Sequence, residues 1–377
     1  MPDTPRHSAV DAFRGVTIAL MIIVNNQGDW SHVYRAFRHA AWHGWLGADI
    51  VFPFFLFILG VSISLSFTAR SARGDSRWAS ARKIVSRSAV LVGLGLAINF
   101  LPDFSLASVR IPGVLQRIGV CYLFVALIFL RFGAGARWAI SLALLAGYGL
   151  ILHCLAPGAP GDAALSPAGN VCLAVDRFLL AGHTYAHAAV PGFDPEGIVS
   201  TLGALASALA GTLAGDLLVK TGSGESTRRR ATGALFIAGG IAVAAGAVLS
   251  YWIPINKNLW TPSYAVFMAG MSSVFLAALN WIMEEKKLTA WATPFLALGM
   301  NAIVAYVLSS ALGKILALVK LVPRDGGYIA LKTALYETLF ASWLKPHAAS
   351  LTYSLAYLLF WTAAIYVLYR KRIFIKI

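Results

Sequence analysis

The chain has 377 residues, of which 58% are hydrophobic and only 12% are charged, and its mean hydropathy is +0.71. A soluble domain is nearer half apolar and a quarter charged, so this composition excludes an ordinary water-soluble fold. The net charge of +15 would suggest nucleic acid in a soluble protein. Here the basic residues lie in short gaps between apolar runs, where they orient a membrane protein, and we expect no nucleic-acid partner.

The apolar runs are roughly 17 to 25 residues long, which fits membrane-spanning helices and not the short alternating strands of a barrel. Lipid offers no hydrogen bonds, so each span must satisfy its own backbone. We therefore predict an all-α polytopic bundle, with residues 1–377 forming a single transmembrane domain. The ten predicted spans are 10–27, 46–68, 84–101, 112–131, 137–155, 197–219, 231–253, 262–282, 291–313 and 350–369. Two long gaps remain, 156–196 and 314–349.

Every second gap is rich in Lys and Arg, as is the C-terminal tail. By the positive-inside rule these segments belong in the cytoplasm, which places both termini there. We expect a multi-pass protein of a bacterial inner membrane. The first loop, the segment before 197 and the turn near 257 then lie together on the outer face.

The first predicted loop carries His32, His39 and His43 among tryptophans. Imidazole titrates near neutral pH, so a histidine here can act as a base or a nucleophile. The alternative is an interfacial aromatic belt with incidental histidines, and the residues alone slightly favour it. His39 and His43 are four apart, but no third ligand is obvious and we expect no metal.

Ionisable and amide side chains also fall inside the predicted spans, where charges are costly and often functional. Asp11 and Arg14 share one face of the first span, as a structural pair or as part of a pathway. Asp49 lies early in the second span. Gln116 and Arg117 lie early in the fourth, and we expect Asp49, Asp194 or Glu196 as the partner of Arg117.

Two motifs precede predicted spans on the outer face. Asp194 and Glu196 flank Pro195. This pattern fits a helix N-cap followed by Pro in the first turn. It fits equally well two carboxylates at the outer mouth of a polar cavity. The turn before the eighth span holds polar and aromatic side chains suited to sugar hydroxyls and sugar rings. These are Asn256, Lys257, Asn258 and Trp260.

Smaller features suggest structural roles. Gly211 and Gly215 form a small-xxx-small pair that lets helices approach closely. Cys154 and Cys172 flank a predicted outer loop, so a disulfide is open to them, although ordinary thiols are the simpler interpretation. Cys121 lies inside an apolar run.

Motifs recurring in order over nearly the whole chain resemble the heparan-α-glucosaminide N-acetyltransferase family. They are Val10-Asp11-Ala12-Phe13-Arg14-Gly15, Val24-Asn25-Asn26, His39-Ala40-Ala41-Trp42-His43-Gly44-Trp45, Ala48-Asp49-Ile50-Val51-Phe52-Pro53, Gly113-Val114-Leu115-Gln116-Arg117, Asp194-Pro195-Glu196-Gly197, Asn256-Lys257-Asn258-Leu259-Trp260 and Gly299-Met300-Asn301-Ala302.

The resemblance implies transfer of acetyl from cytosolic acetyl-CoA, across the membrane, to the amine of a glucosamine. The family's proposed acetyl carrier or general base matches His39, and Asn25 matches an asparagine that would hold the acetyl oxygen or orient the imidazole. Asp11, Arg14 and Asn301 lie in matching motifs and are candidates on the acetyl-CoA path. The resemblance thus favours a catalytic His39 over the interpretation of His39 as an incidental member of an aromatic belt.

Bacterial relatives of this short architecture resemble inner-membrane proteins associated with N-acetylglucosamine use, for which transport is the usual assignment. The alternative to a transferase is therefore a transporter of amino sugars, with the same residues forming a binding site. The lipid bilayer, acetyl-CoA and an amino sugar are the expected partners, and a homodimer is a candidate assembly.

Overall fold

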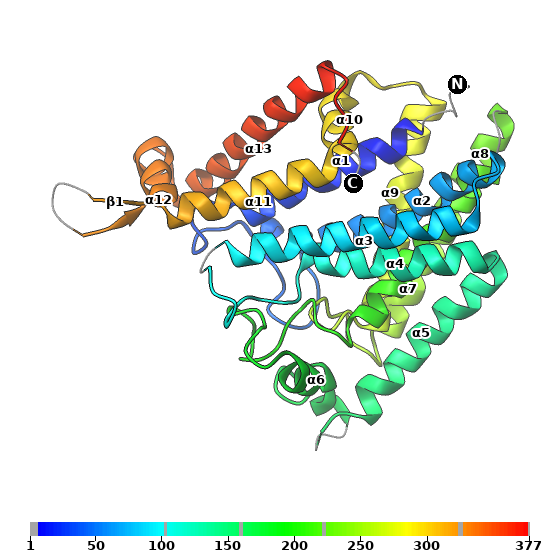
Figure 1. Cartoon of the computed structure of the whole chain (residues 1–377), viewed down its shortest axis with the longest axis horizontal. Helices are drawn as coiled ribbons and strands as arrows, with labels where there is room; N and C mark the ends of the chain where they lie inside the picture. Colours follow the sequence, from blue (N-terminus) through cyan, green and yellow to red (C-terminus); the bar gives the residue numbers. More distant parts are fainter. Residues whose placement is uncertain (1–6, 102–103, 158–160, 221–223, 323–326, 376–377) are drawn as a thin grey trace.

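The computed structural model describes residues 7–101, 104–157, 161–220, 224–322 and 327–375. Their regular secondary structure is almost entirely helical, which confirms the predicted all-α class (Figure 1). By length and composition, nine described helices can cross a membrane, or ten if one bent pair counts as a span. The prediction of about ten spans is confirmed.

The long helices alternate in direction and are joined by turns or by longer loops. They are α1 (Ser8–Asn25), α2 (Val51–Ala72), α3 (Arg77–Phe100), α4 (Val114–Arg131), α5 (Ala134–Cys154), α7 (Thr201–Lys220), α8 (Glu225–Leu249), α9 (Pro262–Asn280), α11 (Ala302–Leu318) and α13 (Pro346–Arg370). Shorter helices are α6 (Val171–Leu180), α10 (Thr293–Met300) and α12 (Leu331–Tyr336), and α9 continues into a π-helical turn at Trp281–Glu285. A hairpin of two short strands, β1 (Lys320–Leu321) and β2 (Ile329–Ala330), projects beyond α11 (Figure 1).

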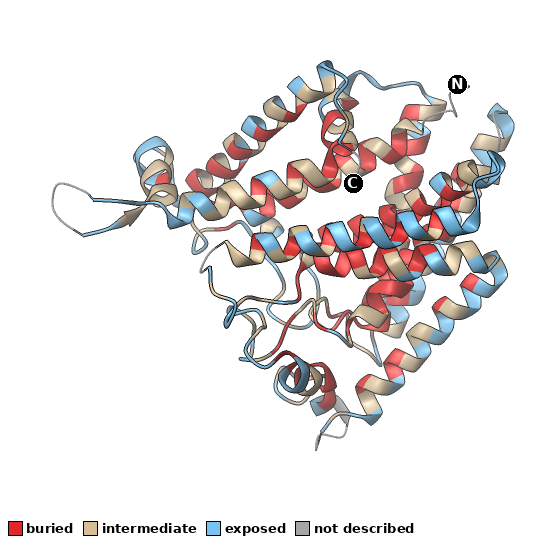
Figure 2. Cartoon of the chain, viewed as in Figure 1, coloured by how far each residue is buried: buried red, intermediate tan, exposed pale blue. Residues whose placement is uncertain are grey.

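The helices divide into a buried centre and a more exposed periphery (Figure 2). The span that contains α2 is 78% buried within the chain, whereas that of α8 is only 22% buried and those of α3, α5 and α13 are 28% buried. The exposed side chains of these outer helices are nevertheless large and apolar, for example Leu142, Ile237 and Leu359. Such a surface is stable facing lipid tails and would aggregate in water.

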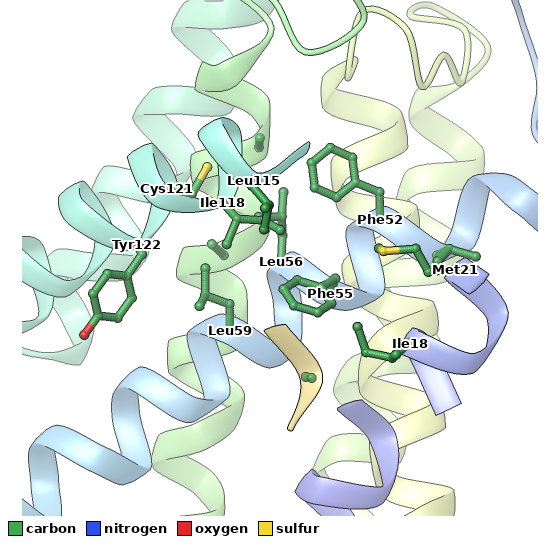
Figure 3. Packing of buried hydrophobic residues seen from close by; sticks show 14 of the residues in the cluster. Ile18, Met21, Phe52, Phe55, Leu56, Leu59, Leu115, Ile118, Cys121 and Tyr122 are labelled. Atoms are coloured by element: carbon green, nitrogen blue, oxygen red, sulfur yellow. The ribbon is translucent and has the colours of Figure 1, made fainter. Parts of the chain in front are cut away.

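The largest apolar core lies where α1, α2 and α4 meet. Figure 3 shows Phe55 and Leu56 of α2 between Ile18 of α1 and Leu115 of α4. Side chains of α7, α9, α11 and α13 complete the same cluster. This core fixes the helix ends from which the polar loops emerge.

Glycines bring α2 and α7 unusually close. A Cβ added at Gly211 would lie 2.0 Å from the Phe57 carbonyl oxygen, and one at Gly60 would lie 1.9 Å from the Ala208 carbonyl oxygen. Gly215 likewise faces Ser64. The interpretation of Gly211 and Gly215 as a packing motif is confirmed, because a larger residue at either position would force the backbones apart.

The ninth predicted span, 291–313, is not one helix. It divides at Asn301 into α10 and α11, whose axes differ by 74°. Gly15 and Gly299 explain the bend, because a Cβ at Gly15 would lie 1.7 Å from the Phe295 carbonyl oxygen and one at Gly299 1.9 Å from that of Asp11. The short helix α10 therefore packs against the start of α1 and cannot continue in line with α11.

Helix α7 begins at Thr201 and not at the predicted Asp194 cap. Residues 194–200 form turns, in which the Asp194 carboxylate accepts from the Glu196 N–H at 2.9 Å, as a cap would, and also binds an arginine. The long gap 156–196 contains α6, and the gap 314–349 contains the hairpin and α12. All three cysteines are free, and Cys172 is buried beside Tyr148, so ordinary thiols were the correct interpretation.

Candidate active site

Polar loops gather at the end of the bundle where α1 finishes and α2, α4, α7 and α9 begin. The loop after α1 carries His39, and backbone pairing joins it to the turn before α9, where Gly44 bridges Asn256 and its N–H donates to the Ile255 carbonyl at 2.7 Å. Gly44 has a φ of +89°, a conformation that glycine adopts without strain. Motifs that are more than 200 residues apart in sequence thus lie side by side.

His39 and Asp49 form the centre of this region. His39 Nδ1 lies 2.7 Å from Asp49 Oδ1, while the backbone N–H groups of Ala40 and Leu46 donate to Asp49 Oδ2 at 2.9 Å each. The Asp49 side chain is 1% exposed, but that of His39 is 47% exposed. A buried, fully bonded carboxylate therefore fixes the orientation of a ring whose other nitrogen is open.

Asp49, and not Lys257, determines which ring nitrogen of His39 carries the proton. Lys257 Nζ lies 3.0 Å from His39 Nδ1 and 3.5 Å from Asp49 Oδ1. An ammonium only donates, so Nδ1 cannot accept from Lys257 while also donating to Asp49. The buried carboxylate is the stronger acceptor, so we assign Nδ1–H to Asp49, Lys257 to the same carboxylate, and a free lone pair to Nε2.

The turn that carries Lys257 is rigid. Asn256 is fully buried, its Oδ1 accepts from the Leu259 N–H at 2.9 Å, and its Nδ2 lies 3.3 Å from His43 Nδ1. Trp260 is 1% exposed and donates its indole N–H to Ser207 at 3.0 Å. Asn256 and Trp260 thus hold the turn in place, and Lys257 and the half-buried Asn258 are the members that face outward.

Asp194 and Glu196 are bound by an arginine that the sequence interpretation missed. Arg110 donates from Nε and Nη2 to the two oxygens of Asp194 at 2.8 and 2.6 Å, and Nη2 also contacts Glu196 Oε2. Burial raises the pKa of Glu196, but the positive charges of Arg110, Arg117 and Lys257 outweigh it and hold that pKa below its usual value. The two clusters are joined through Arg117, which bonds the Gly197 carbonyl and lies over Trp260, in the same turn as Lys257.

The expected carboxylate partner of Arg117 was wrong. Arg117 is 2% exposed and donates from Nη2 to the Gly197 carbonyl and to Ser200 Oγ, with its guanidinium over Trp260 at 5.4 Å. Asp194 and Glu196 are already bonded to Arg110, which lies closer to them in the fold. Among the described residues, Arg117 Nε and Nη1 and Gln116 Nε2 are buried without a hydrogen-bond partner. Such groups are costly unless a ligand or water satisfies them.

Asp176 of α6 was also missed. Its carboxylate accepts from the N–H groups of Asp194 and Ile198 at 3.1 and 3.3 Å and so holds the turn that presents Glu196. Burial raises the pKa of Asp176 to about 6. A lone acid in the apolar run of α6 was the available signal, as was a lone arginine between residues 104 and 116 for Arg110.

Asn25 is the last residue of α1, and its side chain is exposed, unlike those of Asn26 and Gln27, which are buried. Its amide is therefore open at the same end of the bundle as the loop of His39. Among the described residues, no three His, Cys, Asp or Glu side chains come together where they could hold a metal ion.

Asp11, Arg14 and Asn301 lie at the other end of α1. Arg14 donates to Asp11 at 3.2 Å, to the Gly299 carbonyl at 3.2 Å and to Ser62 Oγ at 2.7 Å. Asn301 is 1% exposed and bonds the backbone of the C-terminal segment, donating to Ile373 and accepting from Ile375. The side chain of Asn301, at the break between α10 and α11, is thus bonded by the backbone of the C-terminal segment.

The fold and these clusters define a multi-pass helical membrane protein with a histidine–carboxylate pair among polar loops at one end of the bundle. A family model described as heparan-alpha-glucosaminide N-acetyltransferase, catalytic, matches residues 6–166. The human protein named heparan-alpha-glucosaminide N-acetyltransferase is 33% identical over 422 residues, covering 99% of this chain and 60% of the relative. The mouse protein of that name is 32% identical over 430 residues, covering 100% of this chain and 62% of the relative.

Over nearly its whole length the chain is thus similar to heparan-alpha-glucosaminide N-acetyltransferases, and its residues 6–166 carry the match to their catalytic family model. It spans about 60% of the length of the curated relatives that it matches.

Proposed function

We propose that this chain is a transmembrane acetyltransferase that moves acetyl from cytosolic acetyl-CoA to the amine of a glucosamine-type sugar. The similarity to heparan-alpha-glucosaminide N-acetyltransferases supports the class of reaction. The observation that carries the proposal is the contact of 2.7 Å between His39 Nδ1 and the buried Asp49, with the ring half exposed. A histidine held this way presents Nε2 as a nucleophile or base, the arrangement used in acyl transfer.

His39 serves the transfer in either of two ways. As a nucleophile, Nε2 attacks the thioester carbonyl carbon, the carbon–sulfur bond breaks and CoA leaves as the thiolate. The sugar amine then attacks the acetyl carbon and displaces the imidazole, whose Nε2 takes up the amine proton. As a base, Nε2 removes a proton from the amine while it attacks the thioester directly. In both cases His39 becomes positive, and Asp49 stabilises that charge.

Helix α1 carries a candidate partner for the CoA phosphates near one end and for the acetyl group at the other. From Arg14 to Asn25 is eleven residues, or about 16 Å of helix, a distance that an extended pantetheine arm can cover. We propose that Arg14, held by Asp11, meets the CoA phosphates on the cytoplasmic side. Asn25, whose amide is open, would donate to the acetyl oxygen. Asn301 supports this end of the bundle by holding the C-terminal segment.

The acceptor side consists of the loops around His39. Lys257 and Asn258 offer donors to sugar hydroxyls, and Glu196 offers a carboxylate to the amine. The unsatisfied N–H groups of Gln116 and Arg117 are further donors for a bound substrate. Asp194, Asn256 and Trp260 hold these groups in place. We propose that this face is periplasmic in a bacterial inner membrane, with both termini cytoplasmic and the whole chain acting as one acyltransferase-like unit.

A transporter of amino sugars is the second candidate. The break between α10 and α11 favours it, because discontinuous helices often bind substrate in transporters. The transferase is preferred because the break is occupied by Asn301 and the C-terminal backbone, whereas the His39–Asp49 pair has no evident use in transport.

The test is release of CoA thiol by detergent-purified protein given acetyl-CoA and glucosamine. We expect His39→Ala to abolish turnover and Asp49→Asn to lower it by about 100-fold or more, because the ring loses its fixed tautomer. His32→Ala is the matched control, since His32 also contacts a carboxylate in this loop, with Nδ1 2.6 Å from Asp29. Saturable sugar binding without acetyl-CoA binding would overturn the transferase in favour of the transporter.

A further inference from the structure

Arg110 is a heavily bonded charged side chain among the loops of the candidate site. It lies in the segment between α3 and α4, its side chain is 20% exposed, and it reaches two carboxylates at once. The fork to Asp194 uses both oxygens of that group, and Nη2 is shared with Glu196. A lysine has a single donor nitrogen and cannot reproduce this geometry.

Arg110 is itself held on several sides. Its guanidinium lies over the ring of Tyr185 at 4.5 Å, and Asn99 Nδ2 donates to the Arg110 carbonyl at 3.0 Å. The neighbouring Ile111 N–H donates to the His183 carbonyl at 2.9 Å, and His183 Nδ1 lies 2.8 Å from the Val109 carbonyl. The arginine is therefore fixed before any ligand arrives.

The contacts divide the two carboxylates into different roles. Asp194 is fully buried and both of its oxygens are used, so it anchors Arg110. Glu196 is 11% exposed and meets Arg110 through Oε2, which leaves Oε1 outside these contacts. The next residue, Gly197, is bonded through its carbonyl to Arg117, whose guanidinium lies over Trp260. Trp260 belongs to the turn of Lys257, which contacts His39, so the segment of Glu196 packs against the turn that reaches the imidazole.

We propose that Arg110 is a positioning residue for acceptor recognition, which holds Glu196 so that its second carboxylate oxygen receives the amino group of the acceptor sugar. The inference rests on the proposed transferase and adds how the enzyme distinguishes an amine from a hydroxyl. A fixed carboxylate binds an ammonium through a charge-assisted hydrogen bond and gains much less from a neutral hydroxyl. Pre-organisation by Arg110 removes the cost of ordering Glu196 on binding.

The experiment compares Arg110→Lys and Glu196→Gln with wild type in the purified full chain. We expect both to raise the KM for glucosamine by about 10- to 100-fold, the usual size of a hydrogen bond to a charged group. The Kd for acetyl-CoA should stay within about twofold, because Arg110 and Arg14 lie at opposite ends of the bundle. The preference for glucosamine over glucose as acceptor should fall in parallel.

Arg177→Gln is the matched control. Arg177 also donates from Nε and Nη2 into this loop, at 3.2 and 3.0 Å, but to the Pro191 carbonyl and not to a carboxylate. It should leave the KM for glucosamine within about twofold. A general loosening of the loop would raise KM in all three variants.

The double variant Arg110→Lys, Glu196→Gln completes a double-mutant cycle. Its KM should be no higher than that of the worse single variant, because both changes remove the same interaction. The proposal is overturned if Glu196→Gln leaves the KM for glucosamine unchanged, or if the two changes multiply.

Calorimetric titration of glucosamine in the absence of acetyl-CoA separates this proposal from the proposed function. If wild type binds glucosamine without transferring acetyl, the transferase fails, while Arg110→Lys should still weaken the binding. If Arg110→Lys does not fold, Glu196→Gln alone must show the effect.

Discussion

At the scale of single residues, this protein places charged side chains inside or beside the membrane only where other polar groups meet them. Asp49 accepts two backbone N–H groups as well as His39, and Asp194 accepts a full guanidinium fork. Several charged groups among the described residues are exceptions, and the buried, unsatisfied Nε and Nη1 of Arg117 are the ones beside the candidate site. Leaving donors unpaired costs about 1–3 kcal/mol each, which explains why such an arrangement points to ligand binding.

Asp176 gives a prediction for the pH dependence of stability. Burial raises its pKa from 3.8 to about 6, so the folded state holds this proton more tightly than the unfolded state does. The stabilisation is fully present below pH 3.8 and is lost as the pH rises through 6, a change of about 3 kcal/mol at most. Asp176→Asn cannot titrate, so its unfolding free energy should lack this decline.

Thermal unfolding of the two proteins between pH 4 and 7 checks the Asp176 prediction. Subtracting the stability of the variant from that of wild type at each pH cancels the titration of other groups. This stability difference should shrink or reverse as the pH rises. Parallel curves over that range would contradict it.

At the scale of helices, the existence of the spans was predictable because twenty apolar residues in a row leave few alternatives. The break at Asn301 was not, because its cause lies elsewhere: Gly15, far away in sequence, admits the Phe295 backbone, and Gly299 admits that of Asp11. The start of α7 was misplaced for a similar reason. A local cap at Asp194 was reasonable, but Arg110 and Asp176 provide stronger partners from other segments.

The contact between α1 and α10 gives a prediction at this scale. Gly15→Ala or Gly299→Ala places a Cβ within 2 Å of a backbone oxygen, so the helices must separate. We expect the unfolding free energy to fall by about 1–3 kcal/mol or more. The measurement is the midpoint of thermal unfolding in detergent.

The matched control is Gly147→Ala on α5, where an added Cβ meets nothing within 4 Å. This change should be neutral or should stabilise by about 0.5–1 kcal/mol, because alanine favours a helix interior. A midpoint for Gly15→Ala equal to that of the control would show that the close packing does not matter.

At the scale of the whole molecule, the residues of the candidate site could be predicted only as members of motifs. Nothing in the sequence showed that Asp49 pairs with His39 or that Lys257 joins them across 208 residues, because these contacts depend on how the loops converge. Arg110 had no motif or periodicity at all, and its partners lie 84 and 86 residues later. The resemblance to the family predicted the reaction, and the fold was needed to show which side chains contact one another.

Orientation in the membrane is a prediction for the whole chain. In a cysteine-free background, we expect Leu106→Cys, in the segment before α4, to react with an impermeant maleimide in spheroplasts. Leu106 is 78% exposed. Asp75→Cys, in the exposed turn between α2 and α3, should react only after the membrane is permeabilised. The reverse pattern would place His39 in the cytoplasm and rule out transfer across the membrane.

The packing of α1 against α10 also has a consequence for biogenesis. Asp11 and Arg14 enter the bilayer with α1, yet the Gly299 carbonyl that receives Arg14 is made some 285 residues later. Throughout that interval the ribosome holds a partly inserted chain in which α1 still lacks one of its polar partners. Truncated products of this protein should therefore be recognised as unassembled and degraded, even when every span that they contain is intact.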